Sequence, residues 1–220
     1  MLEQQDLFEA RTHGYKTYRI PGLAVTGAGT VLATAEARPG GGGDYDFNDI
    51  LLRRGTDGGA GFDPFVKVVD HADYGEGPVS NFVMIPDSAD GRVHAVFCHD
   101  YARVFHMFSA DDGVSFSEPR EITPVFEEFR EEYPWRVCAT GPGHGTRLRN
   151  GRMIVPVWLS DSTAGDFGPN HRGHRPSDVV SIYSDDRGAT WQAGEFVART
   201  GDEVEGVTVR YASETVAVEL

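Results

Sequence analysis

Short apolar runs separated by turn-forming residues dominate the hydrophobic pattern of the chain. Each run has the length of a single β-strand, which predicts strands joined by tight turns. The clearest runs cover residues 22–25, 30–35, 50–52, 92–97, 153–158 and 179–183. Helical periodicity is confined to residues 124–133, where Phe126 and Phe129 lie three positions apart and predict one or two helical turns. The pattern therefore predicts an all-β fold with many short antiparallel strands.

A short motif follows three strand-like segments. Residues 109–116 and 184–191 share the form Ser-x-Asp-x-Gly-x-[Ser/Thr]-[Phe/Trp], and residues 55–62 are a degenerate copy. The Asp side chain can accept hydrogen bonds from backbone N–H groups across a hairpin turn, and the Gly can adopt a positive φ. The motif aspartates Asp57, Asp111 and Asp186 are 54 and 75 residues apart, which suits one small sheet per repeat. This spacing favours a β-propeller with the motif in its rim turns, and a β-sandwich with unrelated hairpins is the alternative.

Composition and charge narrow the class of protein. The 220 residues carry 34 acidic and 20 basic side chains, a net charge of −14, which argues against a nucleic-acid or anionic-membrane partner. No apolar run approaches the roughly 18 residues of a transmembrane helix. The first residues lack the basic and apolar regions of a signal peptide, and localisation stays open. Cys98 and Cys138 have apolar neighbours and no metal-binding spacing, which predicts two buried free thiols.

Three further motifs, in a fixed order, carry a resemblance to a known family. Residues 18–21 read Tyr-Arg-Ile-Pro, residues 36–38 read Glu-Ala-Arg ahead of a glycine run and the acidic segment 44–49, and residues 141–145 read Gly-Pro-Gly-His-Gly. Together with the repeated motifs, which are Asp boxes, they resemble the exo-α-sialidase (neuraminidase) family of six-bladed β-propellers. The resemblance implies that residues 1–220 are the N-terminal portion of a single propeller domain, about its first three to three and a half blades.

The resemblance also implies residues that bind sialic acid. The family holds the sialic acid carboxylate with three arginines, and Arg19 matches the first of them. Arginine suits this task because its guanidinium stays charged and pairs bidentately with a carboxylate. Arg38 is expected near the carboxylate or the glycerol arm of the sugar. Further candidates share a place where a loop meets a strand, and an ordinary loop role is the alternative for each: Asn81, Tyr101, His144 and Arg147.

Two acidic residues match the catalytic positions of the family. Asp44 follows the glycine run and is expected to be the acid/base, with a flexible loop that closes over the substrate. Asp46 and Asp49 are the alternatives, and Asp49 is interpreted as a structural partner, for example of Arg53. Glu214 matches the glutamate that activates a tyrosine nucleophile, a departure from the usual two-carboxylate glycosidases. That tyrosine and two arginines are expected beyond residue 220, and Tyr211 is not expected to replace the tyrosine.

The sequence thus predicts a retaining exo-α-sialidase that acts on sialylated glycans or glycoconjugates. The alternatives are a non-catalytic or differently specific glycan-binding propeller and a β-sandwich interaction module. The polar segment 170–175 is expected to be an exposed insertion in the third repeat. Its two histidines lack a well-spaced carboxylate, and no metal or other cofactor is expected. Because part of the site is expected elsewhere, residues 1–220 alone are expected to be incomplete and inactive.

Overall fold

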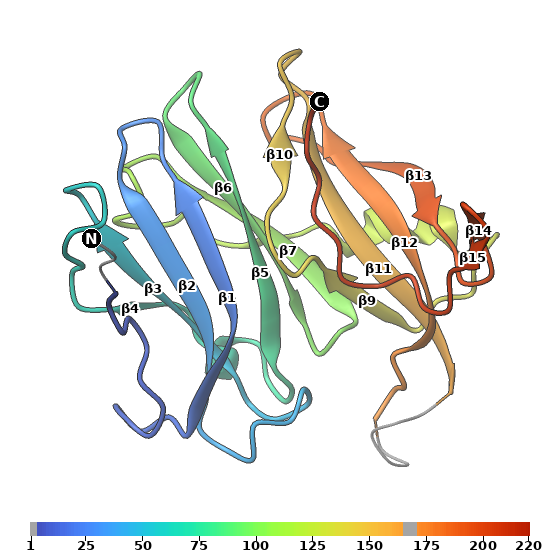
Figure 1. Ribbon diagram of the computed structural model, residues 1–220, viewed down its shortest axis with the longest axis horizontal. Helices are drawn as coiled ribbons and strands as arrows, with labels where there is room; N and C mark the ends of the chain where they lie inside the picture. The colour runs from blue at the N-terminus through green and yellow to red at the C-terminus, as the bar shows by residue number, and fades with distance from the viewer. Residues whose placement is uncertain (1–3, 165–170) are drawn as a thin grey trace.

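Three antiparallel sheets of one design make up the computed structural model, which describes residues 4–164 and 171–220 (Figure 1). The first sheet contains, in spatial order, β1 (Thr17–Val25), β2 (Val31–Arg38), β3 (Asp49–Gly55) and β4 (Val66–Val69). The second contains β5 (Val79–Asp87), β6 (Arg92–His99), β7 (Arg103–Ser109) and β8 (Arg120–Glu121). In the third, β9 (Val137–Thr140) and β10 (Thr146–Arg147) both pair with β11 (Met153–Ala164), which is followed by β12 (Arg175–Ser184) and β13 (Gln192–Ala198).

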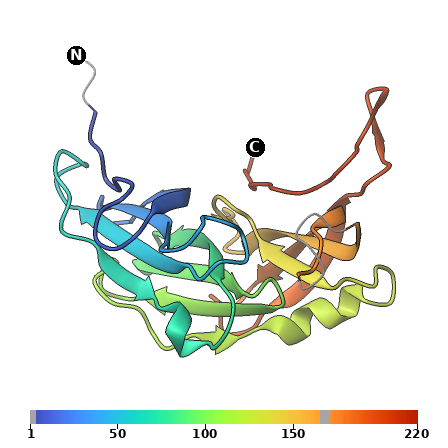
Figure 2. The ribbon, with the colours of Figure 1, turned by 90° about the horizontal axis from the view of Figure 1, so that it is seen from below.

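Consecutive strands are neighbours in the first two sheets, and in the third β9 and β10 lie along the same edge of β11 as one interrupted strand. Each sheet is therefore an up-and-down meander of the kind that forms a propeller blade. The sheets follow one another along an arc, as the view from below shows (Figure 2). Their first strands are adjacent, because β5 contacts β1 on one side and β9 and β10 on the other. This arrangement confirms the predicted all-β propeller-type fold, and we call the sheets blades 1, 2 and 3.

The hydrophobic core lies between the blades. One cluster joins Leu32 and Ile50 of blade 1 to Phe97 of blade 2, and a second joins Ile85 of blade 2 to Val155 of blade 3. Each blade buries its faces against its neighbours, as alternating strand residues do in packed sheets. All six apolar runs found in the sequence lie within strands of these blades.

The remaining elements are short. The 3-10 helices are η1 (His71–Asp73) and η2 (Thr123–Phe129), and a small hairpin pairs β14 (Glu203–Val204) with β15 (Val207–Thr208). The helical turns expected at 124–133 are thus confirmed as η2, which buries Phe126 and Phe129. Cys98 and Cys138 are free and buried as predicted, and burial raises the pKa of both thiols. In the described part of the chain, every helix is too short or too polar to cross a membrane.

The Asp boxes close the turn between the third and fourth strands of each blade. In blade 2 the Asp111 carboxylate accepts hydrogen bonds from the backbone N–H and the hydroxyl of Ser115, at 2.9 and 2.5 Å. In blade 3 the Asp186 carboxylate accepts the equivalent bonds from Thr190, at 2.7 and 2.6 Å. Gly113 adopts a φ of 79°, which favours glycine. The bonds from Ser115 hold the pKa of Asp111 at about 2. The predicted hairpin chemistry of the motif is confirmed.

The fourth box position connects each blade to the blade before it. Asp112 of blade 2 accepts hydrogen bonds from Thr26 and Thr30, which flank the β1–β2 turn of blade 1. At the same box position in blade 3, Arg187 lies 3.7 Å from Asp90 in the β5–β6 turn of blade 2. The boxes therefore link successive blades at the end of the molecule opposite the candidate site described next.

Candidate active site

The innermost strand of every blade is interrupted at the same place. β1 shifts register just after Arg19 and β5 just after Ser80, and in blade 3 the segment 141–145 separates β9 from β10. Ile20 and Asn81 follow these two residues with φ values of 52° and 58°, in the left-handed region. A β-bulge bends its strand and re-aims the neighbouring side chains. The interruptions therefore give the inner strands three matching places from which side chains can be aimed.

Arg19 and Arg38 both donate to one oxygen of Asp44. Their Nη1 atoms lie 2.9 and 3.0 Å from Asp44 Oδ1, and Arg38 Nη1 also donates to the carbonyl oxygens of Gly42 and Gly43 at 2.8 and 2.9 Å. The side chain of Arg38 is only 1% exposed, whereas that of Arg19 is 46% exposed. The structure thus joins three of the predicted site residues in one cluster, with the glycine loop lying over Arg38.

Glu36 belongs to this cluster, although the sequence analysis did not select it. Its carboxylate pairs with Arg38 Nη2 through one oxygen and accepts the backbone N–H of Asn81 at 2.8 Å through the other. Burial raises the pKa of Glu36, and the charge of Arg38 opposes that shift. An acidic residue inside the otherwise apolar and small run 31–37 was the available signal, because a buried charge needs a partner.

Asn81 acts through its backbone in this arrangement. Its N–H donates to Glu36 of blade 1, and its carbonyl oxygen accepts a 2.6 Å bond from the Thr140 hydroxyl of blade 3. The bulge in β5 thus connects the inner ends of the three blades. Asn81 lies beside the arginine cluster, as expected, and its predicted contact with a substrate stays a prediction.

Asp46 and Asp49 have structural partners. Asp46 Oδ2 accepts the backbone N–H of Gly43 at 2.9 Å and so shapes the glycine loop. Asp49 is buried, and its carboxylate accepts hydrogen bonds from Tyr15 at 2.6 Å and from the backbone N–H of His71 at 3.1 Å, and it pairs with Lys67 at 2.9 Å. Asp49 is therefore structural, as interpreted, but its cationic partner is Lys67 rather than Arg53.

Among the described residues, one cluster has the composition of a metal site: Asp49, Asp70 and His71. The ammonium group of Lys67 already lies between its carboxylates, 2.9 Å from Asp49 and 2.8 Å from Asp70. A lysine supplies the positive charge that a cation would supply, so both carboxylates already have a cationic partner.

Asp44 and Glu214 line a single cleft of about 440 Å³. The remaining residues along it come from blade 3 and the C-terminal segment, and they are Trp158, His174, Arg175, Ser177, Tyr211 and Ser213. The guanidinium of Arg175 lies 4.7 Å from the centre of the Tyr211 ring. The two predicted catalytic acids, 170 positions apart in the sequence, are thus brought to the same cavity.

Residues 172–174, just before β12, fold back into the structure. Tyr45, Tyr101 and His174 form a group of rings with centroid separations of 4.6 to 5.5 Å, and Arg172 pairs with Asp100 at 2.5 Å. The prediction of an exposed polar insertion is therefore wrong for residues 172–174, because the rings and the ion pair give their polar groups partners. Asn170 of that prediction lies outside the described residues. Tyr101 itself is buried in the core.

His144 and Arg147 lie apart from the arginine cluster in the contacts that the structure gives. His144 forms an isolated bridge with Met84, and its Nδ1 lies 3.3 Å from the carbonyl oxygen of Gly145. Arg147 pairs at 2.8 Å with Asp87, a fully buried carboxylate, which favours a structural role. The substrate contact predicted for His144 remains a prediction.

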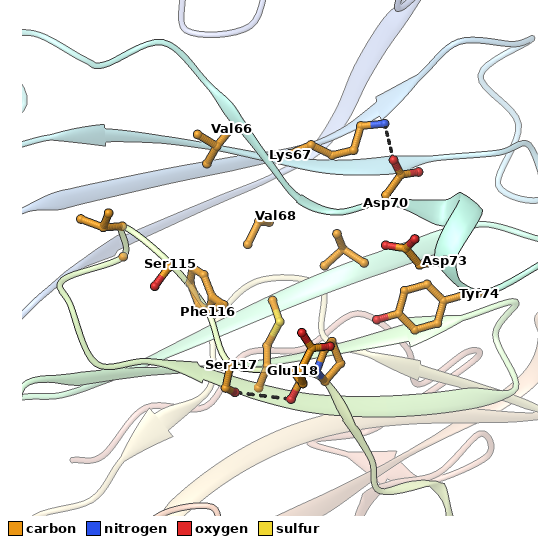
Figure 3. A pocket seen from close by; sticks show the side chains of 15 residues that line it. Val66, Lys67, Val68, Asp70, Asp73, Tyr74, Ser115, Phe116, Ser117 and Glu118 are labelled. Atoms are coloured by element: carbon orange, nitrogen blue, oxygen red, sulfur yellow. Dashed lines mark hydrogen bonds and ion pairs between the residues drawn. The ribbon is translucent and has the colours of Figure 1, made fainter.

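A larger groove lies elsewhere, on the rim between blades 1 and 2. It has a volume of about 850 Å³ and is walled by β4 and by residues 113–119 of the second Asp box and its extension (Figure 3). Lys67 pairs there with Asp70, and Tyr74 lies near Asp73 and Glu118. None of the predicted site residues lines it, and the cleft of Asp44 and Glu214 is therefore the better candidate.

Comparison with known families agrees with this fold. A family model described as BNR repeat-like domain matches residues 29–219. The match covers most of the chain, and the protein therefore belongs to the BNR repeat-like domain family.

Its relatives among curated proteins are sialidases. A sialidase of Micromonospora viridifaciens is 30% identical over 92% of this chain and 33% of its own length. Human Sialidase-4 is 31% identical over 87% of this chain and 42% of its own length. The chain thus spans between a third and a half of the length of these relatives.

Solved sialidase structures share the fold. The Hadza microbial sialidase Hz136 superposes with a TM-score of 0.68 at 22% identity, covering 85% of this chain and 39% of that one. The intramolecular trans-sialidase from Ruminococcus gnavus, solved with oseltamivir carboxylate, gives a TM-score of 0.67 at 16% identity, covering 90% and 64%.

Proposed function

We propose that this chain supplies the arginine and acid side of an exo-α-sialidase active site, which releases terminal sialic acid from a sialylated glycan or glycoconjugate. The observation that carries the proposal is the shared cleft of Asp44 and Glu214, with Arg19 and Arg38 donating to Asp44. The sialidase relatives add independent support for the substrate class.

In the proposed mechanism Arg19 and Arg38 bind the sialic acid carboxylate, because guanidinium groups match carboxylates in charge and geometry. Asp44 protonates the glycosidic oxygen as it leaves, while a tyrosine oxygen forms a bond to the anomeric carbon. Asp44 then takes a proton from the water that displaces this tyrosine, and the two displacements together retain the anomeric configuration. Glu214 removes the proton of a tyrosine nucleophile. We assign that tyrosine to residues outside 1–220, although Tyr211 lines the same cleft.

The test is sialic acid release from a fluorogenic sialoside by the product of the complete reading frame. We expect Asp44→Asn and Glu214→Gln to reduce kcat by at least about 100-fold, in line with the loss of an acid/base group. Tyr211→Phe should retain activity, since the proposed nucleophile lies elsewhere. Residues 1–220 alone should release no sialic acid. Full activity of Asp44→Asn would overturn the catalytic assignment.

A glycan-binding propeller is the second candidate function, favoured by one observation. Asp44 is engaged by two arginines, and a carboxylate held in this way is poorly placed to donate a proton. Binding of a sialylated glycan by the complete product without any release of sialic acid would support this candidate over the enzyme.

A further inference from the structure

A second cleft, rich in arginine, lies on the blade 2 to blade 3 boundary. It has a volume of about 370 Å³, and its lining residues are Ala102, Thr123, Glu127, Arg130, Trp135, Arg136 and Arg172. The side chains along it carry three positive charges and one negative charge, in a chain whose net charge is −14. The cleft therefore has the opposite sign of charge to the molecule as a whole.

Two of these arginines have partners that fix them in place. Arg130 pairs with Glu127 at 2.7 Å and lies 3.9 Å from the ring centre of Trp135. Arg172 pairs with Asp100 at 2.5 Å, and its Nε is buried without a hydrogen-bond partner in the described residues. Both guanidinium groups are held in the wall of the cleft at little further entropic cost.

Arg136 differs from both. Its backbone N–H donates to the carbonyl oxygen of Ser160 at 2.7 Å, which fixes the position of its backbone at the start of β9. Its side chain is exposed, and across residues 4–164 and 171–220 it makes no hydrogen bond or ion pair. An uncompensated guanidinium at the mouth of a cleft is a ready anion-binding group.

The arginine cleft is adjacent to the candidate active site. Tyr45, next to Asp44 in the chain, donates its hydroxyl to the carbonyl oxygen of Arg172 at 2.8 Å. The segment 171–175 is shared between the two cavities, because Arg172 lines the arginine cleft while His174 lines the cleft of Asp44. This shared segment makes the two cavities neighbours on the surface.

We propose that the cleft of Arg130, Arg136 and Arg172 binds a second acidic group, a carboxylate or a sulfate, carried by the same glycan whose terminal sugar enters the Asp44 cleft. This inference rests on the proposed function and narrows its substrate class to glycans with a second negative charge near the scissile sugar. Arg136 supplies the free charge, and Arg130 and Arg172 contribute the fixed guanidinium groups of the cleft wall.

Calorimetric titration of the complete product carrying Glu214→Gln, in which hydrolysis of sialosides is slowed, tests the proposal with three glycans: sialyl-lactose, disialyl-lactose and a sulfated sialyl-trisaccharide. We expect at least one doubly charged glycan to bind about tenfold to a hundredfold more tightly than sialyl-lactose, the range for one hydrogen bond to a charged group. The disialyl and sulfated ligands identify the carboxylate or the sulfate as the source of that gain. Arg136→Gln should abolish the preference and leave the affinity for sialyl-lactose unchanged.

Arg187→Gln is the matched control, because it removes the same charge from an exposed box residue that makes only a 3.7 Å ion pair. The preference should persist in that variant. Equal affinity of all three glycans, with sialyl-lactose bound, would overturn the inference and leave the proposed function intact. A preference that survives Arg136→Gln would also overturn it. Failure of sialyl-lactose to bind at all would instead count against the proposed function.

Discussion

Asp44 occupies the place beside Arg19 and Arg38 where a substrate carboxylate would have to bind. Both Arg19 and Arg38 donate to Asp44 Oδ1, and a ligand carboxylate must displace that oxygen before it can pair with them. Asp44→Asn removes the competing charge and keeps the size of the side chain. We therefore expect this variant to bind free sialic acid more tightly than the parent protein, while losing the acid/base group.

The size of the gain in affinity for sialic acid depends on how exposed the Arg19–Asp44 and Arg38–Asp44 ion pairs are. Arg19 and Asp44 are 46% and 26% exposed, and solvent screening limits such a pair to about 0.2–1 kcal/mol. The Arg38 side chain is 1% exposed, and its bond to Asp44 is less screened, but Arg38 keeps Glu36 as a partner in the variant. Together these effects give about 1.4 kcal/mol, which corresponds to about tenfold in the dissociation constant.

Calorimetric titration with N-acetylneuraminic acid measures this gain, and its methyl ester is the control ligand, because an ester lacks the charge that competes with Asp44. Asp46→Asn is the control variant: it makes the same change in the same loop, and the hydrogen bond given for the Asp46 side chain is to the N–H of Gly43. Unchanged or weaker binding by Asp44→Asn, with Asp46→Asn equal to the parent, would refute the competition between Asp44 and the ligand.

Three further predictions concern stability. Glu36→Gln should lower the free energy of unfolding by about 3 kcal/mol in urea, because it removes the buried anion of Arg38 and leaves only the partly exposed Asp44 to pair with that guanidinium; a loss below about 1 kcal/mol would contradict this. Burial, and then the neighbouring His94, lowers the pKa of His106 to about 3, whereas in the unfolded chain this pKa returns to the ordinary 6.5. The free energy of unfolding should therefore be highest above pH 6.5 and should fall by up to about 1.4 kcal/mol per pH unit below it. His106→Phe should flatten that slope, and an unchanged slope in thermal melts would count against the assignment. Asp111→Ala should lower the free energy of unfolding by about 1–2 kcal/mol, and by more than Asp57→Ala does. The reason is that Asp111 accepts three hydrogen bonds within its box, whereas Asp57 accepts one within its own. Equal losses of the two variants in urea titrations would disprove the difference.

The blades were predictable because their signals are local. Each central strand has an apolar run, and each Asp box encodes its own turn through an aspartate and a glycine within eight residues. The fourth strands were harder to find, because β4 is short and β13 is half-exposed and so lacks a strong hydrophobic pattern. The identity of the partner of Asp49 also escaped prediction, since Lys67 reaches it only across the β3–β4 pairing.

The sequence predicted the charged residues of the candidate site, but not the residues that hold them in place. Arg19, Arg38 and Asp44 followed from the order of motifs, and the structure brings them together. Glu36 escaped because a single acidic residue in a strand looks like a surface position until blade 2, which carries Asn81, is placed over it. The inward fold of Arg172 escaped for a similar reason: its partner Asp100 lies in another blade.

The shared interruption of the inner strands explains why repeated blades build an asymmetric site. A strand with regular pairing alternates its side chains between two faces that the neighbouring blades cover. An interruption at one register frees the backbone there, and each repeat uses that freedom differently: blade 1 presents Arg19, blade 2 offers the N–H and carbonyl of Asn81, and blade 3 inserts residues 141–145. Because Glu36 and Thr140 bind the two backbone groups of Asn81, a change at the blade 2 bulge would shift the partners of Arg38 without touching a ligand.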